Sequence, residues 1–176
     1  DHVIEGWLSA YPGAGIGLAY GPDRVLGVDL DFTEPAMAAR ANDIVHATLG
    51  PNDCVRIGRL PKRLYLYRAA PGLIVPGKAF GGYELFSTSG QTVLYGTHPD
   101  TRQPYYWPCS SPEDIGPSDL PVASQAALDA MIGGLAPICS RSPRVSRSPS
   151  SVSGGRVTDW LRCFAENDAD PAALCQ

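Results

Sequence analysis

The sequence lacks the residue pairs that build zinc sites and disulfide frameworks. Its five cysteines are odd in number and scattered, with no C-x-x-C pair among them. This pattern argues against a structural zinc site or a disulfide-stapled secreted domain and favours a reducing compartment. No apolar run approaches the length of a transmembrane helix, and no signal peptide is recognisable at the N-terminus. We therefore expect a cytoplasmic protein with no membrane partner.

Glycine and proline, by contrast, are abundant. The 176 residues include 19 glycines and 17 prolines, and 44% of all residues are hydrophobic. This composition predicts many turns around a real core, so we expect a mixed sheet with few long helices rather than a helical bundle. The loop 12–17 is rich in glycine, but no G-K-[ST] follows it, so it is not a Walker phosphate-binding loop.

The composition changes along the chain and divides it into three parts. Residues 1–139 carry the patterns of a folded domain, which need not be complete at its N-terminus. Residues 140–155 are nearly all Ser, Arg, Pro and Gly and predict a flexible linker. Residues 156–176 predict a helical segment, with Val157, Trp160, Leu161 and Phe164 on one face.

Alternating and β-rich runs predict the strands, and clusters of Gly, Pro and Ser predict the turns between them. Strands are expected at 16–20, 25–31, 54–57, 64–68, 83–86 and 91–95, the last two forming a hairpin over 87–90. A helix with Pro35 in its first turn, capped by Thr33 or Asp31, is expected to end at Gly50-Pro51. A second helix is expected over 124–132, with Gly133-Gly134 after it.

Two carboxylates stand two residues apart in the apolar run V-L-G-V-D-L-D-F, residues 25–32. Period-two alternation places Asp29 and Asp31 on one face of the predicted strand, about 7 Å apart. Their repulsion and desolvation favour a nearby cation, and a divalent metal is the simplest candidate. The alternative is a strand end at which both carboxylates face water or cap the next helix.

A basic segment and a third carboxylate follow. Between Val55 and Tyr83 there are six basic residues and no acidic one, and Glu84 then stands in an apolar strand. Asp29, Asp31 and Glu84 could together hold two Mg²⁺ or Mn²⁺ ions about 4 Å apart. Nearby Lys and Arg side chains could hold a triphosphate, as nucleotidyl transfer to a 3′-hydroxyl requires. Each basic residue could equally belong to a solvated strand face.

Three ordered segments resemble the primase-polymerase domain of the archaeo-eukaryotic primase superfamily, in the form found in phages, plasmids and other mobile elements. They are Gly15–Leu18 with Val28–Phe32, then Gly58–Arg68, and then Tyr83–Phe86 with Gly96–Trp107. The resemblance covers roughly residues 10–135. It implies a two-lobed α+β fold, with a modified RNA-recognition-like catalytic sheet and a small αβ module.

The resemblance also implies roles for individual residues. Asp29, Asp31 and Glu84 become the catalytic and metal-binding residues of a DNA primase or polymerase, with Mg²⁺ or Mn²⁺ as cofactor. The implied partners are a single-stranded DNA template, nucleoside triphosphates and a downstream helicase domain or subunit, in a bacterial or phage-infected cell. Where the family commonly has Ser-x-His, this chain has Pro61-Lys62-Arg63. Either Lys62 and Arg63 take over the phosphate contact, or His98 replaces the missing histidine, or nucleotide binding is weakened. The candidate nucleotide contacts are Lys62, Arg63, Arg68 and His98.

Two other functions stay open on the sequence alone. An Asp-x-Asp pair can hold Mn²⁺ on a nucleotide-sugar in a glycosyltransferase, but this leaves Glu84 and the basic segment unassigned. A replication-initiation module could instead keep the fold and bind DNA without catalysis. The missing Ser-x-His favours that possibility, and the three carboxylates oppose it.

Overall fold

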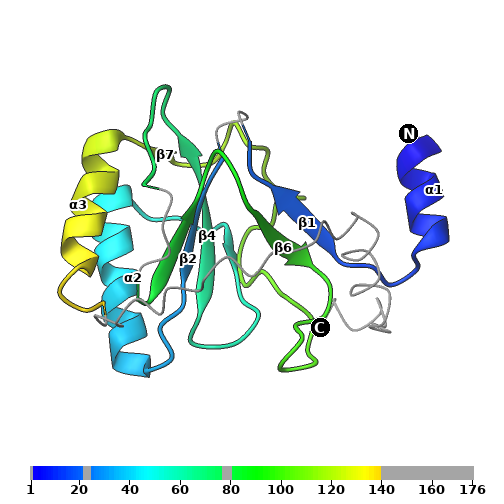
Figure 1. Ribbon diagram of the computed structural model, residues 1–176, viewed down its shortest axis with the longest axis horizontal. Coiled ribbons are helices and arrows are strands. Elements are labelled where there is room, and N and C mark those ends of the chain that lie inside the picture. Colours follow the sequence, from blue (N-terminus) through cyan, green and yellow to red (C-terminus); the bar gives the residue numbers. More distant parts are fainter. Residues whose placement is uncertain (1, 22–24, 77–80, 140–176) are drawn as a thin grey trace, which may run out of the picture.

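The computed structural model describes residues 2–21, 25–76 and 81–139 (Figure 1). The predicted linker at 140–155 and the predicted helical segment at 156–176 lie outside the described residues. In chain order the elements are α1 (His2–Ala10), β1 (Ile16–Ala19), β2 (Val25–Leu30), α2 (Pro35–Leu49), β3 (Val55–Arg56), β4 (Arg63–Ala69), β5 (Tyr83–Phe86), β6 (Gln91–Tyr95), β7 (Val122–Ala123) and α3 (Gln125–Leu135). This mixture of helices and mainly antiparallel strands confirms the predicted α+β class.

The larger sheet has the strand order β3–β4–β2–β5, and β7 joins it by pairing in parallel with β4. The central strand β2 has antiparallel neighbours on both sides. Helices α2 and α3 cover one face of this sheet (Figure 1). The core beneath them includes Leu26, Val28, Leu30, Tyr65, Tyr67, Tyr83, Leu85, Ala41, Val45, Leu128, Met131 and Leu135. Because side chains alternate along a strand, Asp29 and Glu84 lie on the opposite face.

A two-stranded ribbon of β1 and β6 packs against that opposite face. Gly27 allows the close approach, since a Cβ atom there would lie 2.2 Å from the Tyr20 hydroxyl. The same hydroxyl is 3.0 Å from Thr92 Oγ1 of β6, and the Tyr20 ring stacks on Phe86 of β5 at 5.3 Å. The ribbon is therefore fixed against β2 two residues before Asp29.

The predicted hairpin of β5 and β6 is wrong. β5 pairs with β2 in the larger sheet, whereas β6 pairs with β1 in the ribbon. Tyr83 and Leu85 of β5 are buried beneath the helices, while Leu94 of β6 belongs to the core between the two sheets. The residues 87–90 therefore carry the chain from one sheet to the other, because the two strands bury their apolar side chains in different cores.

Helix α2 begins at Pro35, but Glu34 is its cap, so the prediction of Thr33 or Asp31 as the cap is wrong. The Glu34 carboxylate accepts hydrogen bonds from two backbone N–H groups of the first turn, at 3.0 and 2.7 Å. Asp31 is too early in the chain for this role, since its own N–H still donates to the Gly82 carbonyl at 2.8 Å. The helix ends before Gly50, as the sequence predicts.

Helix α3 continues through Gly133 and Gly134, so the predicted end at residue 132 is also wrong. Its last residue, Leu135, is fully buried. Gly134 lies against Ile44 of α2, and a Cβ atom there would come within 2.8 Å of that side chain. Close packing of the two helices therefore outweighs the poor helix propensity of the two glycines.

The sequence pattern does not predict α1. This helix stands apart from both sheets (Figure 1). Its Trp7 and Leu8 side chains are 64% and 61% exposed. The helix therefore adds nothing to the two cores that position the site.

Candidate active site

Four side chains from four strands form one transverse row on the sheet face opposite the helices. Asp29 of β2 is paired with Glu84 of β5 on one side and with Leu64 of β4 on the other. Leu64 is in turn paired with Arg56 of β3. Residues paired in this way point to the same face, with Cβ atoms about 4.5–5.5 Å apart. Two carboxylates and one guanidinium group therefore share a single row.

Asp29 is the most perturbed carboxylate of this row. Its pKa is raised to about 6, mainly by burial and in addition by the negative charges of Asp31 and Glu84. Arg56 and Lys62 act in the opposite direction and lower it. All four residues therefore lie close enough to act on Asp29. The largest single effect is burial, and the net result favours a proton or a cation at this carboxylate.

Asp31 lies just beyond the end of β2 and keeps the alternation of that strand. Its backbone pairs with Gly82 on the β5 side. On the β4 side its carboxylate oxygen Oδ1 is 2.8 Å from the Lys62 ammonium group. The structure therefore brings Lys62 to the carboxylates, as an ion-pair partner of a predicted metal ligand.

Arg56 is a site residue that sequence reasoning missed. It is only 9% exposed, its Nη1 donates to the Val93 carbonyl of β6, and its guanidinium carbon lies 4.4 Å from the centre of the Tyr105 ring. Its Nε has no hydrogen-bond partner among the described residues. The available signal was a lone arginine in the buried run Cys54–Ile57, where a charge needs a partner.

His98 lies in the loop after β6 and faces the same cluster. Its ring packs on Tyr105 with 5.3 Å between centres, so His98 and Arg56 share that tyrosine. Its Nδ1 accepts hydrogen bonds from the backbone N–H groups of Asp100 and Thr101, at 3.2 and 3.3 Å. Burial lowers the pKa of His98, as do the nearby charges of Arg59, Arg56 and Lys62, and the charge of Asp100 only partly offsets this. The neutral ring therefore carries its proton on Nε2, as a hydrogen-bond donor.

The structure does not bring Arg63 and Arg68 to this cluster. Arg63 pairs with Leu30, whose side chain lies in the core beneath the helices. Its charge acts on the hydroxyl of Tyr65, lowering the pKa of that group against the raising effect of burial. Arg68 pairs with Val25 at the other end of β2, four residues or about 13 Å along the strand from Asp29.

The donor set fits a divalent metal, although its side chains are not gathered around one point. In the ranges the structure describes, no group of three or more His, Cys, Asp or Glu side chains is arranged to hold an ion. The Asp31 carboxylate oxygen Oδ1 is instead paired with Lys62. Carboxylate oxygens are the ligands that Mg²⁺ and Mn²⁺ prefer. The buried charge of Asp29, repelled by Asp31 and Glu84, is an imbalance that a cation relieves.

The family model for the N-terminal domain of bifunctional DNA primase/polymerases, Prim-Pol, matches residues 1–123. The chain belongs to this family. The matched range holds both sheets and every residue of the cluster, so the chain carries a prim-pol domain whose acidic face is Asp29, Asp31 and Glu84. No curated protein matches the chain. None of the helices in the described part of this prim-pol chain has the length and apolar character needed to cross a bilayer.

Proposed function

We propose that this prim-pol domain catalyses template-directed nucleotidyl transfer, as a DNA primase, a DNA polymerase or both. Its setting is the replication of a phage, plasmid or mobile element, in the cytoplasm of a bacterial or phage-infected cell. The observation that carries the proposal is the pairing of Asp29 with Glu84 on neighbouring strands. Asp31 lies at the same end of β2.

Asp29, Asp31 and Glu84 would hold two Mg²⁺ or Mn²⁺ ions. When bound, such ions activate the attacking 3′-hydroxyl and neutralise the leaving pyrophosphate. Opening of the ion pair with Lys62 would let both oxygens of Asp31 join the other two carboxylates. The same opening frees the Lys62 ammonium group, which then becomes available to the polyphosphate.

Basic and donor groups on the β4 side would bind the triphosphate. Lys62 supplies a point charge, and the Nε2–H of His98 supplies a directed hydrogen bond. Arg56 is buried behind them and lowers the pKa of Asp29. It therefore helps to keep this carboxylate ionised, which metal binding requires. The expected partners are single-stranded DNA template, nucleoside triphosphates and a downstream helicase domain or subunit.

Primer extension and de novo synthesis on a single-stranded template, each with Mg²⁺ and with Mn²⁺, test the proposal. Wild-type protein should incorporate labelled nucleotide, and Asp29→Asn and Glu84→Gln should not, with unchanged circular dichroism. Asp43→Asn is the matched control, because Asp43 is an exposed carboxylate on α2. Full incorporation by both site variants would end the two-metal proposal.

A second candidate is a non-catalytic DNA-binding module for replication initiation. The Lys62–Asp31 ion pair favours it, because it satisfies Asp31 without any metal. Template binding that survives Asp29→Asn, together with no incorporation by the wild type under any metal, would decide for this candidate. Family membership gives no support to a glycosyltransferase, and absence of UDP-sugar turnover would complete its exclusion.

A further inference from the structure

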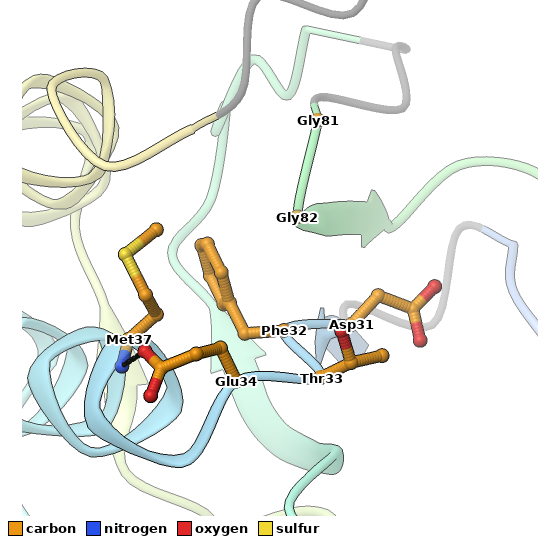
Figure 2. A pocket seen from close by; sticks show the side chains of 7 residues that line it. All are labelled: Asp31, Phe32, Thr33, Glu34, Met37, Gly81 and Gly82. Atoms are coloured by element: carbon orange, nitrogen blue, oxygen red, sulfur yellow. Dashed lines mark hydrogen bonds between the residues drawn. The ribbon is translucent and has the colours of Figure 1, made fainter.

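Two cavities border the central strand β2 and differ in their chemistry. Figure 2 shows the one at the end of β2, which is lined in part by the carboxylates of Asp31 and Glu34. It adjoins the proposed metal ligands and therefore belongs to the site already described. The other has a volume of about 110 Å³ and lies between the ribbon of β1 and β6 and the larger sheet. None of the carboxylates of the site lines this inter-sheet cavity.

Apolar side chains of both sheets form the walls of the inter-sheet cavity. The ribbon contributes Leu18 and Leu94, and the larger sheet contributes Val25 and Leu66. Cys54, directly before β3, also lines the cavity and is only 1% exposed. Among the described residues that line it, none carries a charge, and the Cys54 sulfur is the only polar side-chain atom.

The segment 111–120 covers the cavity on its remaining side, with two prolines, Ile115 and Leu120. This segment is folded by hydrogen bonds of its own, since the Asp114 carboxylate accepts from the N–H and the hydroxyl of Ser111 at 2.8 and 2.7 Å. Ile115 is half-buried and Pro117 is exposed. We therefore expect a small molecule to enter through this segment, without separation of the two sheets.

The polar groups at the wall of the cavity already have partners. The Cys54 N–H donates to Asn52 Oδ1 at 2.8 Å, and the Cys54 carbonyl accepts from the Leu66 N–H at 3.2 Å. The Leu66 carbonyl accepts from Asn52 Nδ2 at 2.7 Å. Burial, with a smaller effect of the Asp114 charge, raises the pKa of the Cys54 thiol to about 11, so the thiol stays neutral. Because a buried water needs about two to four polar partners, the cavity favours an apolar occupant over water.

The cavity adjoins the two segments that hold Arg56 in place. Cys54 stands two residues before Arg56, and Leu94 directly follows Val93, whose carbonyl accepts from the Arg56 guanidinium group. A molecule in the cavity would therefore contact the chain on both sides of this hydrogen bond.

We propose that the inter-sheet cavity is a binding site for a small uncharged apolar molecule, no larger than a single six-membered ring. An engineered apolar cavity of about 150 Å³ stays dry and binds benzene or xenon, and the inter-sheet cavity is somewhat smaller. The Cys54 sulfur favours an aromatic ring, because sulfur makes favourable contacts with ring edges. The inference does not rest on the proposed function, since neither a metal ion nor a nucleotide takes part in it.

Titration of the full chain with benzene, followed by NMR of its methyl groups, tests the site. Saturable ring-current shifts are expected at the methyl groups of Leu66 and Leu94. Benzene should also raise the thermal midpoint, since a ligand stabilises the state that binds it. Phenol carries a hydroxyl group for which the walls offer no partner, so it should bind at least about tenfold more weakly than benzene. A wild type without saturable shifts, or with equal affinities for the two compounds, would overturn the proposal.

Two variants change the volume of the cavity in opposite directions. Cys54→Leu fills it and should weaken benzene binding at least about tenfold, whereas Cys109→Leu makes the same change at an exposed cysteine and should leave the affinity unchanged. Leu18→Ala enlarges the cavity at a half-buried position and should admit para-xylene, which the wild type should exclude. Undiminished benzene binding by a folded Cys54→Leu protein, or equal para-xylene binding by Leu18→Ala and wild type, would place the ligand elsewhere and end the proposal.

Discussion

The Lys62 ammonium group lies 2.8 Å from the Asp31 carboxylate and thus occupies one side of a proposed metal ligand. Its chain neighbour Arg63 acts on Tyr65, on the other face of the sheet. Two adjacent basic residues therefore have different tasks. Lys62 takes part in the charge balance of the site, whereas Arg63 takes part in the contact between the sheet and α2.

The first prediction compares the alanine variants of these two residues. Lys62→Ala should weaken nucleotide binding by about tenfold or more, because it removes one charged hydrogen bond that contributes about 1.5–3 kcal/mol. It should also tighten Mn²⁺ binding to the nucleotide-free protein, because Asp31 loses its competing cation. Arg63→Ala removes the same charge and should leave both affinities unchanged. Calorimetric titration with Mn²⁺ and with a non-hydrolysable nucleotide measures both, and equal effects of the two variants would contradict the division of tasks.

The second prediction concerns stability and pH at Asp29. Because its folded-state pKa is raised to about 6, the folded protein holds a proton that the unfolded chain loses near pH 4. The free energy of unfolding should therefore fall as pH rises from about 4 to about 6, by about 2–3 kcal/mol at most. Asp29→Asn should remove this fall and be the more stable protein at pH 7.5 without metal.

Urea unfolding in EDTA at pH 4 and pH 7.5 measures this difference, with Asp43→Asn as the control at an exposed carboxylate. Addition of Mn²⁺ at pH 7.5 should stabilise the wild type and not the Asp29→Asn protein, since ligand binding stabilises the state that binds it. A variant that gains no stability at pH 7.5 would show that the charge of Asp29 is already balanced in the folded protein.

The third prediction concerns the buried Arg56. Arg56→Met leaves the Val93 carbonyl without its donor and Tyr105 without its cation. We expect a loss of about 1–3 kcal/mol in unfolding free energy. The exposed Arg40 of α2 supplies the control Arg40→Met. A stability equal to wild type would mean that the free energy needed to bury the guanidinium group equals the stabilisation that its contacts provide.

The fourth prediction separates the two nitrogens of His98. His98→Asn keeps an acceptor near the position of Nδ1 and so preserves the bonds from the Asp100 and Thr101 N–H groups. It removes the Nε2–H donor. The thermal midpoint should stay close to wild type, while the nucleotide KM should rise about tenfold or more for a lost hydrogen bond to phosphate. An unchanged KM in a folded variant would assign His98 to the loop alone.

Sequence patterns predicted much of the larger sheet and the placement of Asp29 and Asp31 on one face, and the physical reasons are local. Strict alternation in 25–31 places Asp29 and Asp31 on one face, and the backbone pairing of Asp31 with Gly82 shows that the alternation persists past the strand. The pairing of Asp29 with Glu84 depends on which strands become neighbours. The turn signals at 87–90 could not predict which strands become neighbours, because they do not show in which core each strand buries its side chains.

Sequence patterns were also insufficient to predict which basic side chains reach the carboxylates. Charge alone placed Lys62, Arg63 and Arg68 in one group of nucleotide contacts. The register of β4 separates them, because Arg63 opposes Leu30 and Arg68 opposes Val25. Arg56 stands in a buried apolar run, which is a sequence signal, but its partners, the Val93 carbonyl and the Tyr105 ring, lie far away in the sequence.

Gly27 has no functional group, yet it influences the electrostatics of Asp29. Its bare Cα lets Tyr20 rest on β2, and the ribbon held in this way offers the Val93 carbonyl to Arg56. Arg56 in turn offsets the negative charge on Asp29. The spacing of the two sheets therefore influences the acidity of Asp29. A change in that spacing would shift the pKa of this carboxylate without altering any of the three proposed metal ligands.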